Sequence, residues 1–96
     1  MINISEDGKS VNVSFEGVFD REAENELERL AAWGLGGVEK LCIDMEGVED
    51  ISNTGLRILF YAQKIMNGQG MMYIENAGEK AVMLCRQYDI LCSGRK

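Results

Sequence analysis

The segment from Asp44 to Met66 limits the possible folds of this chain most strongly, because it reads as a strand end, a tight loop and a helix. Ser52 is the natural N-cap of that helix, since its hydroxyl can accept from an amide of the first turn, and Asn53 and Thr54 also suit this role. Apolar residues at helical spacing then fill one broad arc: Leu56, Ile58, Leu59, Phe60, Ala62, Ile65 and Met66. This arc is expected to pack on a sheet.

The opposite side of the predicted helix carries Asn53, Arg57, Tyr61 and Lys64, at offsets of four, eight and eleven residues. These offsets align the four side chains along the solvent side, where they can meet a partner. Gly55 in the first turn costs about 1 kcal/mol relative to alanine, and close approach by another backbone is one reason to keep it. A capped amphipathic helix with a tolerated glycine and no binding role explains the same pattern equally well.

Two apolar segments flank this helix. Residues 38–45 read as a central strand, because the consecutive apolar residues 41–43 are typical of strands covered on both faces. After a glycine-bounded stop, residues 71–74 read as a second buried strand. Strand, helix and strand at this spacing predict a parallel pair.

The first twenty residues predict a hairpin. Ile2 and Ile4 alternate with polar residues, residues 6–9 form a turn signal, and residues 11–15 alternate again, which indicates an antiparallel pair with one wet face. Asp20 can cap the next helix, whose early acidic residues suit its positive dipole end and form a solvated face rather than a ligand site. The buried stripe of that helix is Ala23, Leu27, Leu30 and Ala31, and Trp33 precedes the glycine-rich loop that ends it.

The C-terminal part predicts one more helix and then a short tail. The helix starts near Asn76 and buries Ala81, Leu84, Cys85 and Tyr88. Residues 92–96 are polar, basic and short, so the sequence predicts a mixed sheet of about four strands with helices packed on it. The exposed edge of such a sheet invites pairing. Homodimerisation through that edge, or its completion by a partner, is our hypothesis.

Composition bounds the function. The 96 residues make one domain, residues 1–96, and a net charge of -6 argues against nucleic acid or an anionic membrane as partner. There is no apolar run of about 18 residues and no signal-peptide start, so we expect a cytoplasmic protein without membrane insertion. The chain has no histidine, and its three cysteines include no close C-x-x-C pair. We therefore expect no catalytic triad, no metal site, no cofactor and no disulfide framework.

A family resemblance rests on these same residues. Asp44, then Gly47-Val48, then residues 51–59 (Ile-Ser-Asn-Thr-Gly-Leu-Arg-Ile-Leu) resemble the signature of STAS domains, the anti-sigma factor antagonists and their relatives in sulphate transporters. Residues 17–20 look like the family's Gly-x-Leu-Asp. The resemblance covers about residues 9–91 and implies a STAS-like α/β fold. Family members usually continue with a further strand and a C-terminal helix, which this tail is too short to supply.

One position departs from the family pattern. In members that use a phosphoswitch, the phosphorylated serine stands two residues before the glycine of Gly-Leu, and this chain has Asn53 there. An amide cannot take a phosphoryl group. Ser52 and Thr54, one residue to either side, are the alternative phosphoacceptors.

The first functional hypothesis follows from the resemblance. It is an anti-sigma factor antagonist that acts by partner exchange with a cytoplasmic anti-sigma factor of the serine-kinase type. In relatives with the phosphoswitch, a phosphate at the helix start adds nearly two negative charges and blocks docking. The partner-binding residues would be Asp20, Asp44, Ser52, Asn53, Thr54, Gly55, Arg57, Tyr61 and Lys64.

Two other hypotheses compete with it. One is a STAS subunit of a transporter or sensory complex, in which the same surface is a constitutive, non-phosphorylated interface. The other is an enzyme or phosphoacceptor that holds magnesium with Asp44, Glu46, Glu49 and Asp50 at the carboxyl end of a strand. Without a histidine, a phosphate-binding loop or a nucleophile with its base, we expect no enzyme.

Overall fold

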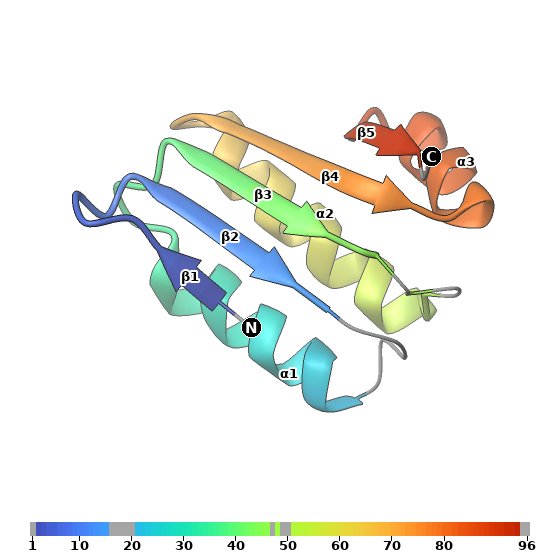
Figure 1. Cartoon of the computed structure of the whole chain (residues 1–96), viewed down its shortest axis with the longest axis horizontal. Helices are drawn as coiled ribbons and strands as arrows, with labels where there is room; N and C mark the ends of the chain where they lie inside the picture. Colours follow the sequence, from blue (N-terminus) through green and yellow to red (C-terminus); the bar gives the residue numbers. More distant parts are fainter. Residues whose placement is uncertain (1, 16–20, 47, 49–50, 95–96) are drawn as a thin grey trace.

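The computed structural model describes residues 2–15, 21–46, 48 and 51–94, and Figure 1 shows the path of the chain. Strands and helices alternate after an N-terminal hairpin. In chain order they are β1 (Ile2–Ile4), β2 (Ser10–Ser14), α1 (Arg21–Arg29), the π-helical segment η1 (Leu30–Gly34), β3 (Lys40–Asp44), α2 (Asn53–Asn67), β4 (Met71–Ala77), α3 (Glu79–Gln87) and β5 (Leu91–Gly94).

The strands form one five-stranded mixed sheet in the order β1-β2-β3-β4-β5. β1 pairs antiparallel with β2, and each later pair is parallel. The hairpin, the central strand and the parallel pair across α2 are therefore confirmed. Parallel neighbours need a helix in each connection, which is why α1, α2 and α3 alternate with the strands.

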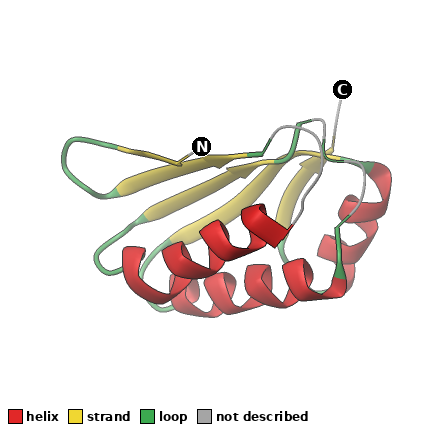
Figure 2. Ribbon diagram, turned by 90° about the horizontal axis from the view of Figure 1, so that it is seen from below, coloured by secondary structure: helices red, strands yellow, loops and turns green. Residues whose placement is uncertain are grey.

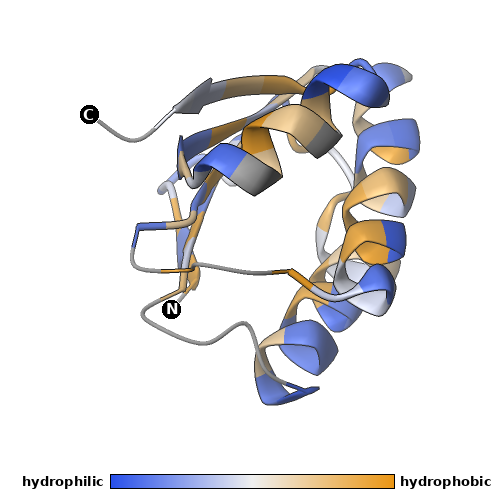
Figure 3. Ribbon diagram, turned by 90° about the vertical axis from the view of Figure 1, so that its right-hand side faces the viewer, coloured by the Kyte–Doolittle hydropathy of each residue, from blue (hydrophilic) through white to orange (hydrophobic). Residues whose placement is uncertain are grey.

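All helices lie on the same face of the sheet, as Figures 2 and 3 show from two directions. The sheet gives this inner face alternate apolar residues, among them Val13, Leu41, Ile43 and Ile74, each at most 1% exposed. α1 and η1 bury Leu27, Leu30 and Ala31, as their spacing predicts. Period-2 strands and period-3.6 helices thus share one core between two layers.

The prediction that both faces of the central strand are covered by helices is wrong. Leu41 and Ile43 face the helices, but Cys42 points to the other face, which no described helix covers. Cys42 is nonetheless only 5% exposed, and its sulfur donates to Glu75 Oε1 at 3.3 Å on the neighbouring strand. We call this side, with Asn12, Lys40, Cys42, Met71, Tyr73 and Glu75, the open face.

The predicted strand count is also wrong. The tail does form a strand, since Tyr73 pairs with Leu91 and Ile74 with Cys92 in parallel register. The α/β class and mixed sheet are confirmed, but there are five strands rather than about four, and the C-terminal strand is present. The described sheet ends at β1 and β5, so pairing through an edge stays a prediction that now concerns these two strands.

The connection from α2 to β4 depends on one glycine. Met71 N donates to Glu39 O at 2.9 Å where β4 begins beside β3. A Cβ on Gly70 would lie 2.1 Å from that carbonyl oxygen, so only glycine lets the two backbones come this close.

Among the described helices, none is long and apolar enough to cross a membrane.

Candidate functional site

Ser52 fixes the start of α2, which is the centre of the predicted site. Its hydroxyl accepts from Gly55 N at 3.0 Å, so the predicted N-cap is confirmed. The same hydroxyl donates to the Glu24 carboxylate on α1. Both hydrogen-bonding roles of the Ser52 oxygen are thus in use, and the bond to Glu24 ties α1 to the first turn of α2.

The next residues of α2 present a polar stripe to solvent. Asn53, Arg57, Tyr61 and Lys64 are all exposed, as their spacing predicts, whereas Gly55 is buried. Among the described residues, none is a hydrogen-bond or ion-pair partner of the Asn53 or Arg57 side chain. The stripe therefore starts at the helix N-terminus, whose first amides and dipole also favour negative groups.

Asp44 lies at the carboxyl end of β3 and bonds within the chain. Its Oδ1 accepts from Glu46 N and from Asn76 Nδ2, each at 3.0 Å. Asn76 itself has a φ of 54° at the end of β4. These bonds hold the start of the β3–α2 loop against β4, so Asp44 shapes the loop that leads into α2.

Several predicted residues cannot be placed. Asp20, Gly47, Glu49 and Asp50 lie outside the described residues, so the structure tests neither the docking role of Asp20 nor the full magnesium cluster. Of that cluster, the described part of the chain contains only Asp44 and Glu46. Within this part, no group of three or more potential metal ligands comes together.

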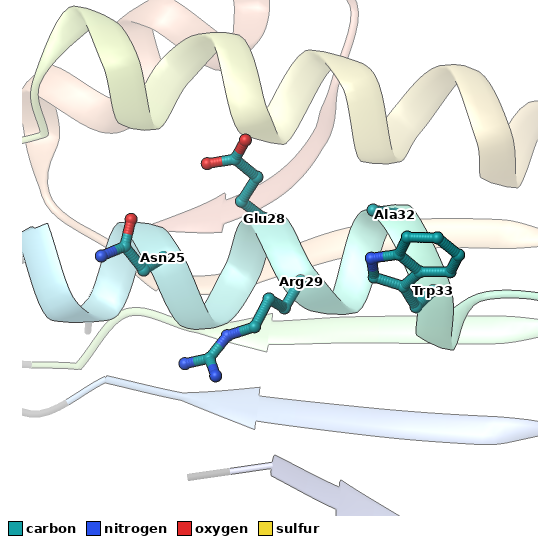
Figure 4. A pocket seen from close by; sticks show the side chains of 5 residues that line it. All are labelled: Asn25, Glu28, Arg29, Ala32 and Trp33. Carbon is teal, nitrogen blue, oxygen red and sulfur yellow. The ribbon is translucent and has the colours of Figure 1, made fainter.

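α1 and α2 lie side by side, and shallow hollows follow their outer surface. One hollow is lined by Glu28, Ala32, Arg57, Ile58 and Tyr61, from both helices. A second runs along α1 and η1 past Asn25, Glu28, Arg29, Ala32 and Trp33, the residues drawn in Figure 4. A third reaches the start of α2 and is lined by Arg21, Glu24, Asn25, Glu28 and Thr54.

Glu28 lines all three hollows, which makes them one continuous surface. Figure 4 shows Glu28 directed from α1 towards α2, with Arg29 directed away from it. We call this region the outer helix surface. It comprises Arg21, Glu24, Asn25, Glu28, Arg29, Ala32 and Trp33 with Asn53, Thr54, Arg57, Tyr61 and Lys64.

Two large aromatic side chains stand on the outer helix surface. The exposed fraction is 88% for Trp33 and 53% for Tyr61. Basic side chains accompany them, since Arg21, Arg29, Arg57 and Lys64 are all exposed here although the whole chain has a net charge of -6. Tryptophan, tyrosine and arginine are the residues that carry most binding energy at protein interfaces.

The sequence interpretation missed the α1 half of this surface, because it took Trp33 only as the residue before a loop. The signal was present: Asn25, Glu28, Arg29, Ala32 and Trp33 follow helical spacing on the side opposite the buried stripe. Their juxtaposition with Arg57 and Tyr61 depends on how the two helices pack. A single-helix pattern does not contain that information.

Comparisons with known proteins agree with this architecture. No protein-family model matches the sequence, and none of the curated proteins matches it. In structure, the chain is similar to the unphosphorylated form of the anti-sigma factor antagonist SpoIIAA, with a TM-score of 0.83 over 100% of this chain and 88% of that one. The sequence identity is 11%, so the likeness shows a shared fold. The STAS fold expected from the resemblance is thereby confirmed.

Proposed function

We propose that this chain is a protein-binding module of the anti-sigma factor antagonist type, which acts by binding rather than by catalysis. The observation that carries the proposal is the outer helix surface, which begins at the N-cap of α2 on a fold shared with SpoIIAA. Its exposed aromatic and basic side chains suit a protein partner. The partner is an anti-sigma factor of the serine-kinase type, met in the cytoplasm.

In this proposal the first turn of α2 and the polar stripe along the same helix dock onto the anti-sigma factor. The anti-sigma factor thereby exchanges its previous partner for this chain. Asn53, Thr54, Arg57, Tyr61 and Lys64 supply direct contacts, because all five are exposed. Asp44 acts through the loop that it holds, since its carboxylate already accepts two bonds within the chain. Asp20 is proposed as a contact from the family pattern alone.

Regulation by phosphate at Asn53 is excluded by chemistry, which leaves two hydroxyls. The Ser52 hydroxyl caps α2 and donates to Glu24. A phosphate on Ser52 would remove that donor and place its charge beside a carboxylate. Thr54 is exposed, and no described residue is a hydrogen-bond partner of its side chain. If the switch operates, we therefore propose Thr54 rather than Ser52 as the phosphoacceptor.

A second candidate function is favoured by the same residues. Asn53 carries no phosphate, and Ser52 is held by its two bonds, so the surface can serve as a permanent interface. The chain would then be a STAS subunit of a transporter or sensory complex and would stay bound without phosphorylation. The two functions differ in the partner and in the mass of the chain, and both can be measured.

Affinity co-purification of the tagged chain from its native cytoplasm tests the proposal. The unmodified chain is compared with Arg57→Glu and Asn53→Asp on the outer helix surface, and with Lys40→Glu on the open face as a matched charge reversal. We expect an anti-sigma factor to co-purify with the unmodified chain and with Lys40→Glu. Arg57→Glu should abolish its recovery, and Asn53→Asp should reduce it, because each adds negative charge where docking occurs.

Intact-mass analysis of the recovered chain separates the two functions. A mass increase of one phosphate that Thr54→Ala removes would support the switch. Transporter or sensor subunits bound to an unmodified chain would support the permanent interface. Equal recovery of the partner by Arg57→Glu and by the unmodified chain would refute both proposals for this surface.

A further inference from the structure

The structure brings together two cysteines that the sequence leaves apart. Cys85 lies on α3 and is 2% exposed. Cys92 lies on β5, is half-buried and packs against the same hydrophobic core. Six residues separate them, so neither a C-x-x-C pattern nor a conventional disulfide spacing draws attention to the pair.

The turn between α3 and β5 determines how the two residues face each other. Asp89 has a φ of 56° and reverses the chain, and the Cys85 carbonyl accepts from Ile90 N at 2.9 Å. Gln63 Nε2 on α2 donates to Asp89 O at 2.9 Å and holds the turn against the helix layer. β5 therefore returns along α3 from a fixed starting point.

Further contacts give the alignment of β5 with α3. A Cβ on Gly94 would lie 3.7 Å from Val82 Cγ2, so Gly94 lies beside Val82. Cys92 is two residues before Gly94 and shares its side of the strand, and Cys85 is three residues after Val82 and shares its side of the helix. Cys85 and Cys92 consequently face each other across the contact between α3 and β5, at the same hydrophobic core.

We propose that Cys85 and Cys92 are a redox-active dithiol, which hydrogen peroxide converts into an intramolecular disulfide. The Cys92 thiolate attacks one peroxide oxygen, the O–O bond breaks, and the leaving hydroxide takes a proton to become water. Cys92 is then a sulfenic acid. The Cys85 sulfur attacks the Cys92 sulfur, the S–O bond breaks, and the departing hydroxide leaves as a second water with the Cys85 proton.

The environments of the two thiols indicate that Cys92 reacts first and Cys85 second. Cys92 is the more exposed thiol and is the one that peroxide can reach. Burial, together with the nearby Cys92, raises the pKa of Cys85 to about 12, so Cys85 stays a protonated thiol at neutral pH. Cys85 therefore serves as the resolving partner, and its high pKa makes the second step slow. The rate of disulfide formation should rise with pH.

The disulfide would join the edge strand β5 to α3. The pairing of β5 with β4 has an irregular register between Ile74 and Ala77, so the sheet alone holds this strand less regularly than its neighbours. A covalent link to α3 would restrain β5 and with it the edge at which pairing is predicted. This inference does not depend on the proposed partner.

Peroxide treatment of the full chain, followed by thiol titration in denaturant, tests the inference. We expect the three thiols of the chain to fall to one, in a product that contains no disulfide between chains and regains all three thiols with dithiothreitol. Trypsin cleaves after Arg86, so a non-reducing digest should contain peptides 81–86 and 87–95 joined, and reduction should separate them.

Two variants serve as controls. Cys42→Ser should still lose both remaining thiols, because Cys42 lies on the open face, and Cys92→Ser should form no intramolecular disulfide. Several results would overturn the inference: no thiol loss in the folded chain, a disulfide that contains Cys42, an intramolecular disulfide in Cys92→Ser, or conversion of Cys92 to a sulfinic acid without a disulfide.

Discussion

The two outer surfaces of this two-layer molecule differ in how their polar groups are used. On the open face, Glu75 accepts from both Cys42 and Tyr73, and the Lys40 ammonium lies 5.6 Å from the Tyr73 ring centroid. On the outer helix surface, Trp33 is 88% exposed. Among the described residues, none is a hydrogen-bond or ion-pair partner of Arg57.

The difference indicates which surface a partner can use. Groups that already bond within the chain gain little from a new contact, because binding would exchange one hydrogen bond for another. Exposed aromatic and guanidinium groups gain the most when a partner removes them from water. We therefore propose that a partner binds the outer helix surface rather than the open face.

The largest effect should come from truncating the exposed indole. Trp33→Ala should weaken partner binding by about 2 kcal/mol or more, roughly thirtyfold, while the free energy of unfolding changes by less than about 0.5 kcal/mol. Calorimetric titration with the co-purified partner and urea denaturation measure the two quantities. A stability loss as large as the binding loss would mean that Trp33 supports the fold instead.

The next effect concerns the open face. Glu75→Ala should lower the free energy of unfolding by about 1–3 kcal/mol, because the Cys42 thiol and the Tyr73 hydroxyl lose their acceptor. Glu28→Ala on the outer helix surface is the matched control and should change it by less than about 0.5 kcal/mol. Urea denaturation of both variants makes the comparison, and equal losses would remove the distinction between the surfaces.

A smaller effect separates the two hydroxyls at the start of α2. Ser52→Ala should cost about 1 kcal/mol of stability, because the Gly55 amide loses its cap. Thr54→Ala should cost less than about 0.5 kcal/mol, since its side chain is exposed. Thermal unfolding of the two variants distinguishes them. An equal loss of stability in Thr54→Ala and Ser52→Ala would show that Ser52 is not the specific N-cap of α2.

The smallest effect is a pH dependence of the open face. The hydrogen bond to Glu75 raises the pKa of Tyr73 above its ordinary value of 10.0, and burial raises the pKa of Cys42 above 9.0. The unfolded chain therefore loses these protons first as pH rises, so the stability that they contribute is present below these ordinary values and declines above them.

Denaturation curves at neutral and alkaline pH test this direction. Between about pH 8 and pH 10.5, the decline in stability should be smaller in Tyr73→Phe than in the unmodified chain. Tyr61→Phe is the control from the outer helix surface. An equal alkaline decline in the unmodified chain and in Tyr73→Phe would show that the Tyr73 proton makes no contribution.

Local patterns predicted much of the fold. The capped start of α2, its buried arc and its exposed stripe all follow from residues within three or four positions of one another, and such information is contained in the sequence. The hairpin and the central strand follow in the same way from alternation and turn residues. These elements are the ones that the structure confirms.

The errors arose where structure depends on distant neighbours. β5 is only four residues long and contains Cys, Ser and Gly, so no apolar alternation marks it, and its pairing with β4 makes it a strand. Cys42 lies on the face of β3 that no described helix covers, and it is buried there beside Glu75 of the next strand, which accepts from Cys42 and from Tyr73. Neither arrangement can be read from local residues.

The candidate site also has a part that local residues predict and a part that depends on distant neighbours. The stripe on α2 could be predicted from one helix, but its continuation through Glu28 to Trp33 requires α1 to pack beside α2. The bonds of Ser52 to Glu24 and of Asp44 to Asn76 join residues that are far apart in sequence. These contacts change the expected roles of Ser52 and Asp44, which composition and spacing alone could not do.

Hydroxyl-radical footprinting of the chain, alone and with its co-purified partner, tests the choice of surface most directly. Both surfaces carry reactive side chains, with Trp33 and Tyr61 on the outer helix surface and Met71 and Tyr73 on the open face. We predict that the partner protects Trp33 and Tyr61 from oxidation and leaves Met71 and Tyr73 unchanged. Protection of Met71 and Tyr73, with Trp33 and Tyr61 still oxidised, would contradict the account.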